Sequence, residues 1–158
     1  MAEIKFLTID GLNKTIQKLY HLVNVEKVKN GEDLKAARAQ GDLSENADYD
    51  AARDEQARLN ARLNEIKEIL KNAVIIKLDN SDKVQNGKFV VLSFVGPKGK
   101  VEQKYQIVGS VEADIDANKL SNVSPFGKAI VGHKKGETVK VLAPKGAIEV
   151  KIVDVTNA

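Results

Sequence analysis

Apolar residues in the first half of the chain recur at alternating intervals of three and four positions. One run starts at Ile9 and another at Ala52, and each would place its members along one stripe of a helix. The first run comprises Ile9, Leu12, Ile16, Leu19 and Val23. The second comprises Ala52, Leu59, Leu63, Ile66, Leu70 and Ala73, with the polar residue Gln56 at one position of the same stripe. Two heptad-like seams are too few for a long two-chain rod, so the pattern predicts an intramolecular antiparallel helical hairpin.

The two runs also predict where the hairpin folds back, because antiparallel partners should have position numbers that add to a near constant. The proposed pairs add to 85 or 86, and they are Leu12 with Ala73, Ile16 with Leu70, Leu19 with Ile66, Val23 with Leu63, and Leu34 with Ala52. The fold-back point is therefore expected near residue 43. Arms of roughly 30 residues would carry it on the order of 40 Å from the base.

The first arm contains one unfavourable pair, Asn30-Gly31, which is typical of the end of a helix. A glycine inside a helix costs about 1 kcal/mol relative to alanine. The near-constant sum argues against a true break, so a kink or a frayed turn is expected at this pair.

The period changes after Ile76. Residues 77–86 are polar and are expected to form a linker, and alternating β-type segments follow at 88–94, 101–108, 138–142 and 147–155. Between the second and third segments, Ser124-Pro125 predicts the start of a short helix that closes at Gly132. The fold class is therefore α+β: a helical hairpin over 1–76, a linker, and an antiparallel sheet with one short helix over 87–158.

Composition excludes several classes of protein. The chain has 158 residues and no cysteine, so disulfide frameworks, thiolate chemistry and the usual zinc sites are excluded. The start lacks the pattern of a signal peptide, and the apolar runs are too short for a membrane span, so a cytoplasmic protein without a membrane partner is expected. Phosphate-binding loops of the P-loop or dinucleotide type are also missing from the sequence.

The net charge of +3 is unevenly distributed. Residues 1–76 have a net charge of −1 and residues 77–158 a net charge of +4, while the segment 42–55 alone carries −5. The predicted hairpin end is therefore acidic and the second half is basic. This division suits a protein that meets a charged partner in one orientation, although solvated faces often show the same pattern.

The acidic segment contains Asp42 and Glu45, three positions apart, in the stretch GDLSENADYD. The spacing fits a capping box, with Asp42 as N-cap of the second helix and Glu45 at its third position. A solvated acidic face without a further role is a second interpretation. In a third, both carboxylates offer oxygen ligands to a hard cation such as Mg²⁺, which would be held weakly unless a partner supplied the remaining ligands.

Residues 37–49, ARAQGDLSENADY, and 51–56, AARDEQ, resemble the tip signature of bacterial transcript cleavage factors of the GreA/GreB family, and GreA more than GreB. The second half is similar to the FKBP-like C-terminal domain of that family at 105–109, 124–129, Gly132 and 136–137. The resemblance covers nearly the whole chain.

The resemblance implies a transcription elongation factor that acts on bacterial RNA polymerase and is not itself an enzyme. The C-terminal domain would dock at the rim of the secondary channel, and the coiled coil would extend to the active centre. There Asp42 and Glu45 would act as catalytic and metal-ligating residues that help to hold a second Mg²⁺, which the isolated protein would not bind stably. The attacked bond would lie in backtracked RNA, near the 3′ end of the transcript.

The same resemblance implies a set of residues that flank the site, namely Asn46, Asp48, Tyr49, Arg38 and Arg53. The two arginines would contact RNA phosphate or brace the tip, and the protein is expected to be a monomer. Two alternatives remain open: a Gre-like homologue that blocks the channel without stimulating cleavage, and a prolyl isomerase built on the FKBP-like half. The Asp-x-x-Glu pattern favours cleavage, and the lack of tryptophan disfavours the isomerase.

Overall fold

The computed structural model describes residues 3–42 and 46–157. The chain divides into two compact units, one made of Leu12–Asn72 and the other of Met1–Gly11 together with Ala73–Ala158. The predicted domain boundary at residue 76 thus differs from this division, which groups the first eleven residues and 73–76 with the C-terminal sheet. No helix among the described residues is long and apolar enough to cross a bilayer.

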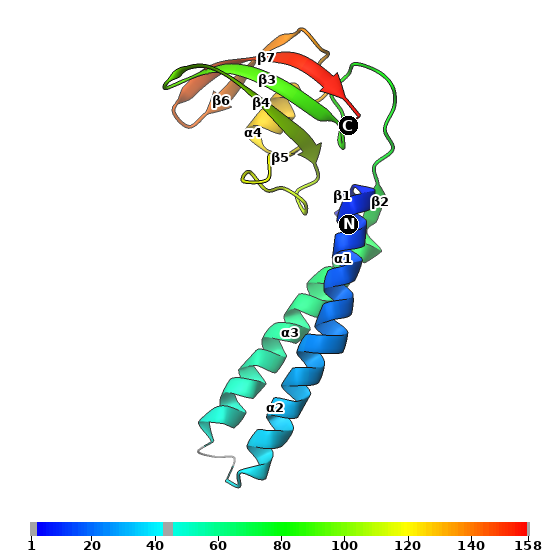
Figure 1. Cartoon of the computed structure of the whole chain (residues 1–158), viewed down its shortest axis with the longest axis vertical. Coiled ribbons are helices and arrows are strands. Elements are labelled where there is room, and N and C mark those ends of the chain that lie inside the picture. Colours follow the sequence, from blue (N-terminus) through cyan, green and yellow to red (C-terminus); the bar gives the residue numbers. More distant parts are fainter. Residues whose placement is uncertain (1–2, 43–45, 158) are drawn as a thin grey trace. The chain divides into compact units, whose positions relative to one another are not determined.

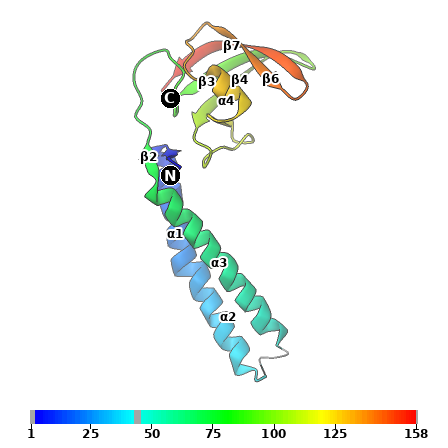
Figure 2. The ribbon, with the colours of Figure 1, turned by 180° about the vertical axis from the view of Figure 1, so that it is seen from behind.

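The first unit is the predicted antiparallel helical hairpin (Figures 1 and 2). The first arm consists of α1 (Ile9–His21), a π-helical turn η1 (Leu22–Glu26) and α2 (Lys27–Ala39), and the second arm is the single helix α3 (Ala47–Lys71). A small core made of Leu22, Leu59 and Ile66, flanked by Leu19, Leu63 and Leu70, joins the arms.

The seam of α3 follows the prediction, because Ala52, Leu59 and Ile66 are buried. The seam of the first arm does not: Ile16 and Val23 are 47% and 42% exposed, although the spacing placed both in the core. Before η1 the buried seam runs through Thr15, Leu19 and Leu22, one position earlier than Ile16 and Val23. The π turn η1 then adds one residue before the seam continues at Asn30 and Leu34. The buried positions of the first arm are Gly11, Thr15, Leu22, Asn30, Leu34 and Ala37, and the half-buried ones are Leu12, Leu19, Glu26 and Lys27.

The kink expected at Asn30-Gly31 is wrong, because α2 continues through both residues. Asn30 is only 5% exposed, and its Nδ2 donates a hydrogen bond of 2.9 Å to the backbone oxygen of Ala52 on α3. The amide therefore faces the other arm and its donor is satisfied, which compensates for its burial. The irregularity of this arm lies one turn earlier, in η1.

The second unit is built on a five-stranded sheet with the order β5-β4-β3-β7-β6. Its strands are β3 (Phe89–Gly96), β4 (Gly99–Val108), β5 (Lys119–Ser121), β6 (Thr138–Ala143) and β7 (Gly146–Thr156). The four predicted strands are confirmed, but the sheet is mixed and not purely antiparallel, because β5 pairs parallel with β4. β5 has only three residues, too few to show the alternation by which a strand is predicted.

The short helix is confirmed as α4 (Pro125–Ile130). Ser124 caps it by accepting a hydrogen bond from the Gly127 nitrogen at 3.0 Å, and Pro125 occupies the first helical position. Gly127 must be glycine, because a Cβ atom there would lie 2.0 Å from the backbone oxygen of Ser121. Ile130 of this helix joins the sheet core, which includes Val90, Leu92 and Ile152.

A second, two-stranded parallel sheet was not predicted. It pairs β1 (Lys5–Leu7) with β2 (Ala73–Ile75), and Leu7 is fully buried. The loop after β4 is hydrogen-bonded to the residue that follows β1. The Glu112 carboxylate in this loop accepts hydrogen bonds from Thr8 N and Oγ1 at 2.8 and 2.7 Å. Three-residue strands of this kind give no periodic signal in the sequence.

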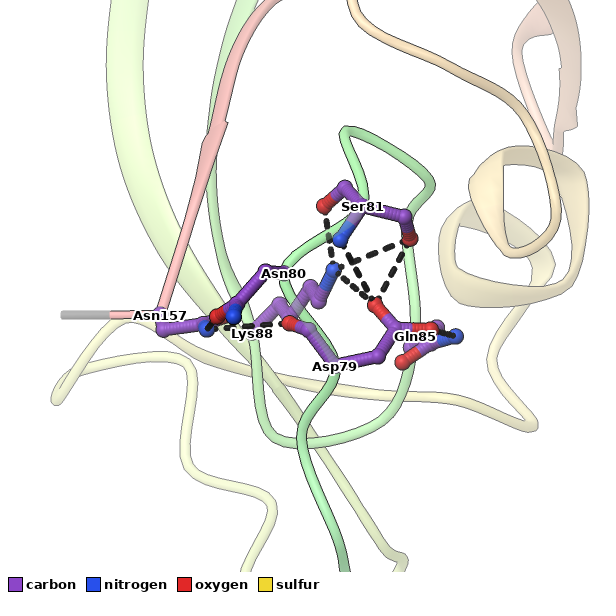
Figure 3. Close-up of polar contacts among 6 residues, drawn as sticks. All are labelled: Asp79, Asn80, Ser81, Gln85, Lys88 and Asn157. Atoms are coloured by element: carbon purple, nitrogen blue, oxygen red, sulfur yellow. Dashed lines mark hydrogen bonds and ion pairs between the residues drawn. The ribbon is translucent and has the colours of Figure 1, made fainter.

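Residues 77–86 contain neither helix nor strand, yet they are attached to the sheet unit (Figure 3). The fully buried ammonium group of Lys88 donates to Asp79 Oδ1 at 2.7 Å and to the backbone oxygen of Ser81 at 2.5 Å. These hydrogen bonds, with those from Ser81 and Gln85, hold the pKa of the Asp79 carboxyl well below its usual range. Val84 also lies in the sheet core, so the segment expected to be a linker is ordered by the domain that follows it.

Candidate functional site at the hairpin tip

The tip is formed where α2 ends and α3 begins. α2 ends with Gln40 as its C-cap residue, and the next residue, Gly41, has a φ of +106°. This left-handed conformation suits glycine because it has no Cβ atom, and it is the usual way to terminate a helix. The chain then turns away from the helix axis, and Asp42, which follows, is exposed.

The capping-box interpretation is wrong, because the N-cap of α3 is Asn46 and not Asp42. Asn46 Oδ1 accepts a hydrogen bond from the Tyr49 nitrogen at 3.0 Å. The same side chain donates from Nδ2 to the backbone oxygen of Ala37 on α2 at 2.7 Å. One amide thus caps α3 and ties its start to the last turn of α2, a role that the high N-cap preference of asparagine could have indicated.

A second contact across the tip involves two residues that the sequence analysis placed beside the site. The guanidinium carbon of Arg38 lies 5.8 Å from the centroid of the Tyr49 ring, which is within the range of a cation–π interaction. Arg38 comes from the last turn of α2 and Tyr49 from the first turn of α3. Their contact and the bonds of Asn46 fix the same two helix ends.

The other flanking residues lie on α3. Asp48 belongs to its first turn, where a carboxylate is favoured by the positive end of the helix dipole, and Arg53 lies further along the helix. Both side chains are exposed. Small residues near the tip (Ala36, Ala37, Ala51 and Ala52) line a shallow groove of ≈ 390 Å³ between α2 and α3 and keep this end of the hairpin thin.

Glu45 lies outside the described residues, as do Leu43 and Ser44, so the structure does not describe the Asp42–Glu45 pair. Within the described ranges 3–42 and 46–157 there is no cluster of three or more side chains suited to a metal ion. An exposed carboxylate on the short segment between α2 and α3 fits Mg²⁺, which accepts one or two protein carboxylates and takes its other ligands from water or substrate. The donor chemistry of the tip therefore suits a metal that is shared with a partner.

Two family profiles match the chain. The family described as Transcription elongation factor, N-terminal, matches residues 5–75, and that described as Transcription elongation factor, GreA/GreB, C-term, matches residues 79–157. Together they cover the hairpin and the sheet unit. The chain belongs to the GreA/GreB family of transcription elongation factors.

Two relatives named transcription elongation factor GreA agree with this assignment. The chain is 52% identical over 136 residues, 85% of each chain, to transcription elongation factor GreA of Acholeplasma laidlawii. It is 41% identical over 157 residues, 98% of this chain and 99% of the relative, to GreA of Caldanaerobacter subterraneus. Among solved structures it is similar to GreA factor homolog 1 of Thermus thermophilus, with 27% identity, a TM-score of 0.44, and coverage of 97% of this chain and 99% of the other.

Proposed function

We propose that this protein binds bacterial RNA polymerase, inserts its helical hairpin into the secondary channel and stimulates the polymerase to cleave backtracked RNA. Membership of the GreA/GreB family supports this proposal, as do relatives that carry the name transcription elongation factor GreA. A thin hairpin with an acidic end has the form required to reach a buried active centre. The protein would act in the cytoplasm as a monomer.

The observation that carries the proposal is the construction of the tip. Asn46 ties α3 to Ala37 of α2, and Gly41 turns the chain so that Asp42 lies exposed between the two helices. In this proposal the oxygens of Asp42 and Glu45 supply ligands for Mg²⁺ and accept hydrogen bonds from the attacking water. They thereby orient that water toward the phosphodiester. Within the polymerase, Mg²⁺ would activate the water and stabilise the leaving oxygen.

Arg38 and Arg53 would lie near the RNA in this arrangement. The contact of Arg38 with the Tyr49 ring limits the positions that its guanidinium adopts, so it is partly ordered before RNA arrives. A fixed guanidinium is suited to a phosphate oxygen at the transcript's 3′ end. The protein thus contributes ligands and positive charge to another enzyme's site and catalyses nothing alone.

The test adds the protein to a backtracked elongation complex and measures RNA length over time in Mg²⁺. We expect wild-type protein to shorten the RNA, and Asp42→Asn and Glu45→Gln each to slow shortening by at least about 100-fold. Asp50→Asn is the matched control, because Asp50 is an exposed acid of the same segment that has no part in the proposed site. It should cleave like wild type.

Three outcomes distinguish the alternatives. Shortening that depends on both carboxylates supports the proposal, whereas reduced RNA synthesis without shortening would identify a channel-blocking inhibitor. Unchanged cleavage by Asp42→Asn or Glu45→Gln would contradict the ligand role. The affinity of each variant for polymerase, measured in parallel, should match wild type because the tip carboxylates are assigned to the reaction and not to docking.

A further inference from the structure

The hairpin has a pocket at the level of the π turn η1, far along the sequence from the tip. It has a volume of ≈ 310 Å³, and its lining comes from α1, η1 and α3, all within the unit Leu12–Asn72. Leu22 and Ile66, which are 1% and 9% exposed, supply its apolar lining. A volume near 300 Å³ lies at the lower end of the range for ligand pockets, so this one suits a compact ligand.

The polar lining of the pocket is mostly cationic. Lys14, Lys18 and His21 lie on α1 at intervals of four and three residues, and therefore on one face of the helix, while Arg62 lies on α3. Glu26 is the single acid among the described lining residues. We call the pocket with these five residues the basic notch. Residues 1–76 have a net charge of −1, so the notch concentrates positive charge on a hairpin that is otherwise slightly acidic.

Arg62 is available to a ligand. Its Nη1 atom lies 3.9 Å from Glu26 Oε1, beyond hydrogen-bond distance, and the two side chains are 48% and 31% exposed. An exposed ion pair of this kind contributes little stability. A guanidinium group presents its N–H donors in a planar fork that matches the oxygens of a phosphate group. A phosphate can therefore take the place of Glu26 as the partner of Arg62.

The basic notch also coincides with the irregularity of the first arm. η1 begins at Leu22 and ends at Glu26, and both residues line the notch. The Lys27 nitrogen donates to the Leu22 oxygen five residues earlier, which is the hydrogen bond of a π-helix. Single π turns within α-helices are frequently found at functional sites. The position of η1 is thus a second observation, independent of charge, that points to a ligand here.

The distribution of charge favours a compact anion over an extended nucleic-acid strand. The basic row from Lys14 to His21 covers seven residues of helix, about 10 Å, which suits a short chain of phosphate groups. The groove near the tip is lined by Asp33, Asp48 and Glu55. A strand that continued along the hairpin would meet these carboxylates, which repel phosphate.

The lining gives no means of recognising a base. None of the described residues that line the basic notch is phenylalanine, tyrosine or tryptophan, the side chains on which bases stack. Recognition would therefore be confined to the phosphate groups. The ligand class is defined by its phosphate chain, whether or not a nucleoside is attached to it.

We infer that the basic notch binds the phosphate chain of a free polyphosphate, such as that of a nucleoside triphosphate, between Arg62 on α3 and Lys18 with His21 on α1. The site differs from the tip in both position and ligand. The inference does not rest on the proposed function, because binding would be a property of the protein without polymerase.

The experiment titrates the full-length protein with tripolyphosphate, ATP, GTP and adenosine in a calorimeter, at low salt and without divalent cations. Tripolyphosphate, ATP and GTP should bind with dissociation constants within about threefold of one another, since the base is not recognised. Adenosine should not bind. The affinity for ATP should fall as salt is added, because the notch is open to solvent.

Three variants of the notch give the sharpest test. Lys18→Gln and Arg62→Gln should each weaken ATP binding by about tenfold, because each removes one charge-assisted hydrogen bond. Glu26→Gln should strengthen binding by about threefold, because it removes the carboxylate that competes for Arg62. A variant that failed to fold would not gain affinity, so this result cannot come from damage to the hairpin.

Matched controls are Lys29→Gln and Lys35→Gln, which neutralise exposed lysines of α2 that do not line the notch. Both should bind ATP within twofold of wild type. The helical circular dichroism signal of every variant is compared with that of wild type to confirm that the hairpin is folded.

The inference is supported if the polyphosphates bind, the two notch variants lose affinity and the controls do not. Absence of binding to wild type would overturn it, as would equal losses in Lys35→Gln and Lys18→Gln, which would indicate attraction to positive charge in general. A ten-nucleotide RNA without a 5′ triphosphate provides a further arm. If it bound more tightly than ATP and depended on Lys18 and Arg62, the ligand would be a nucleic-acid strand and the assigned ligand would be wrong. Each of these outcomes leaves the proposed function to its own test, since polymerase is not present.

Discussion

The two arms of the hairpin differ in regularity although they pack against each other. α3 is an uninterrupted helix of 25 residues, whereas the first arm is divided by the five-residue π turn η1. Along α3 the buried and half-buried positions recur at the 3,4 spacing of a heptad, but on the first arm three successive intervals of four occur between Leu22 and Leu34. The first arm therefore contains one residue more than its seam requires, and η1 accommodates it.

The largest expected difference in stability is between two single-residue deletions, one in α3 and one in η1 of the first arm. Deletion of Ala61, an exposed residue in the middle of α3, would rotate one half of its seam by about 100° relative to the other. Several core side chains would leave the interface, and we expect the hairpin to lose on the order of 5 kcal/mol or more of its free energy of unfolding. Deletion of Asn24 in η1 should instead leave a regular α-helix with Leu22 and Asn30 still facing α3.

Thermal unfolding followed by the helical circular dichroism signal would compare the two deletions. The Asn24 deletion should melt near wild type and retain RNA shortening, because the seam on both sides of η1 keeps its orientation. Equal loss of stability in the two deletion variants would show that η1 does not absorb an extra residue.

The next largest loss of unfolding free energy is expected from alanine substitutions at single positions in the core of the hairpin. Leu22→Ala and Leu59→Ala each remove a side chain that is 1% exposed and should each cost about 2–4 kcal/mol in unfolding free energy. Ile16→Ala and Val23→Ala, at positions that simple heptad spacing assigns to the core, should cost less than about 1 kcal/mol because both side chains are substantially exposed. Chemical denaturation of the four variants provides the measurement, and similar losses at Val23 and Leu22 would contradict the assigned seam.

These positions show what the sequence could and could not predict in the hairpin. The seam of α3 and the fold-back followed from spacing, because an unbroken helix keeps one period. Val23 was misplaced because both Leu22 and Val23 lie at a helical interval from Leu19, and the sequence does not show that Leu22 is the buried one. Asn30 was taken as a sign of helix weakness, whereas its hydrogen bond to Ala52 depends on a partner 22 residues away.

The same limit applies to the sheet unit and the tip. Strands of six residues or more were predicted from alternation, and the Ser124-Pro125 helix start from its capping chemistry, whereas the three-residue strands β1, β2 and β5 gave no signal. At the tip, the three-residue spacing between Asp42 and Glu45 favoured Asp42 as the N-cap of the second helix, whereas the N-cap of α3 is Asn46. Asn46 was recognised only as a flanking residue, because its bond to Ala37 joins two helices that are adjacent only after folding.

The smallest expected effect tests how the two arms are joined at the tip. Asn46→Ala removes both the cap of α3 and the bond to Ala37, and should cost about 1–2 kcal/mol in unfolding free energy. Asn46→Asp keeps an acceptor for the Tyr49 nitrogen but cannot donate to the Ala37 oxygen. It should recover most of the stability, and RNA shortening should stay reduced in both variants because α3 is no longer tied to α2 beside Asp42. If Asn46→Asp restored cleavage to the wild-type rate, capping alone would suffice, and the bond between the arms would have no part in positioning the carboxylates.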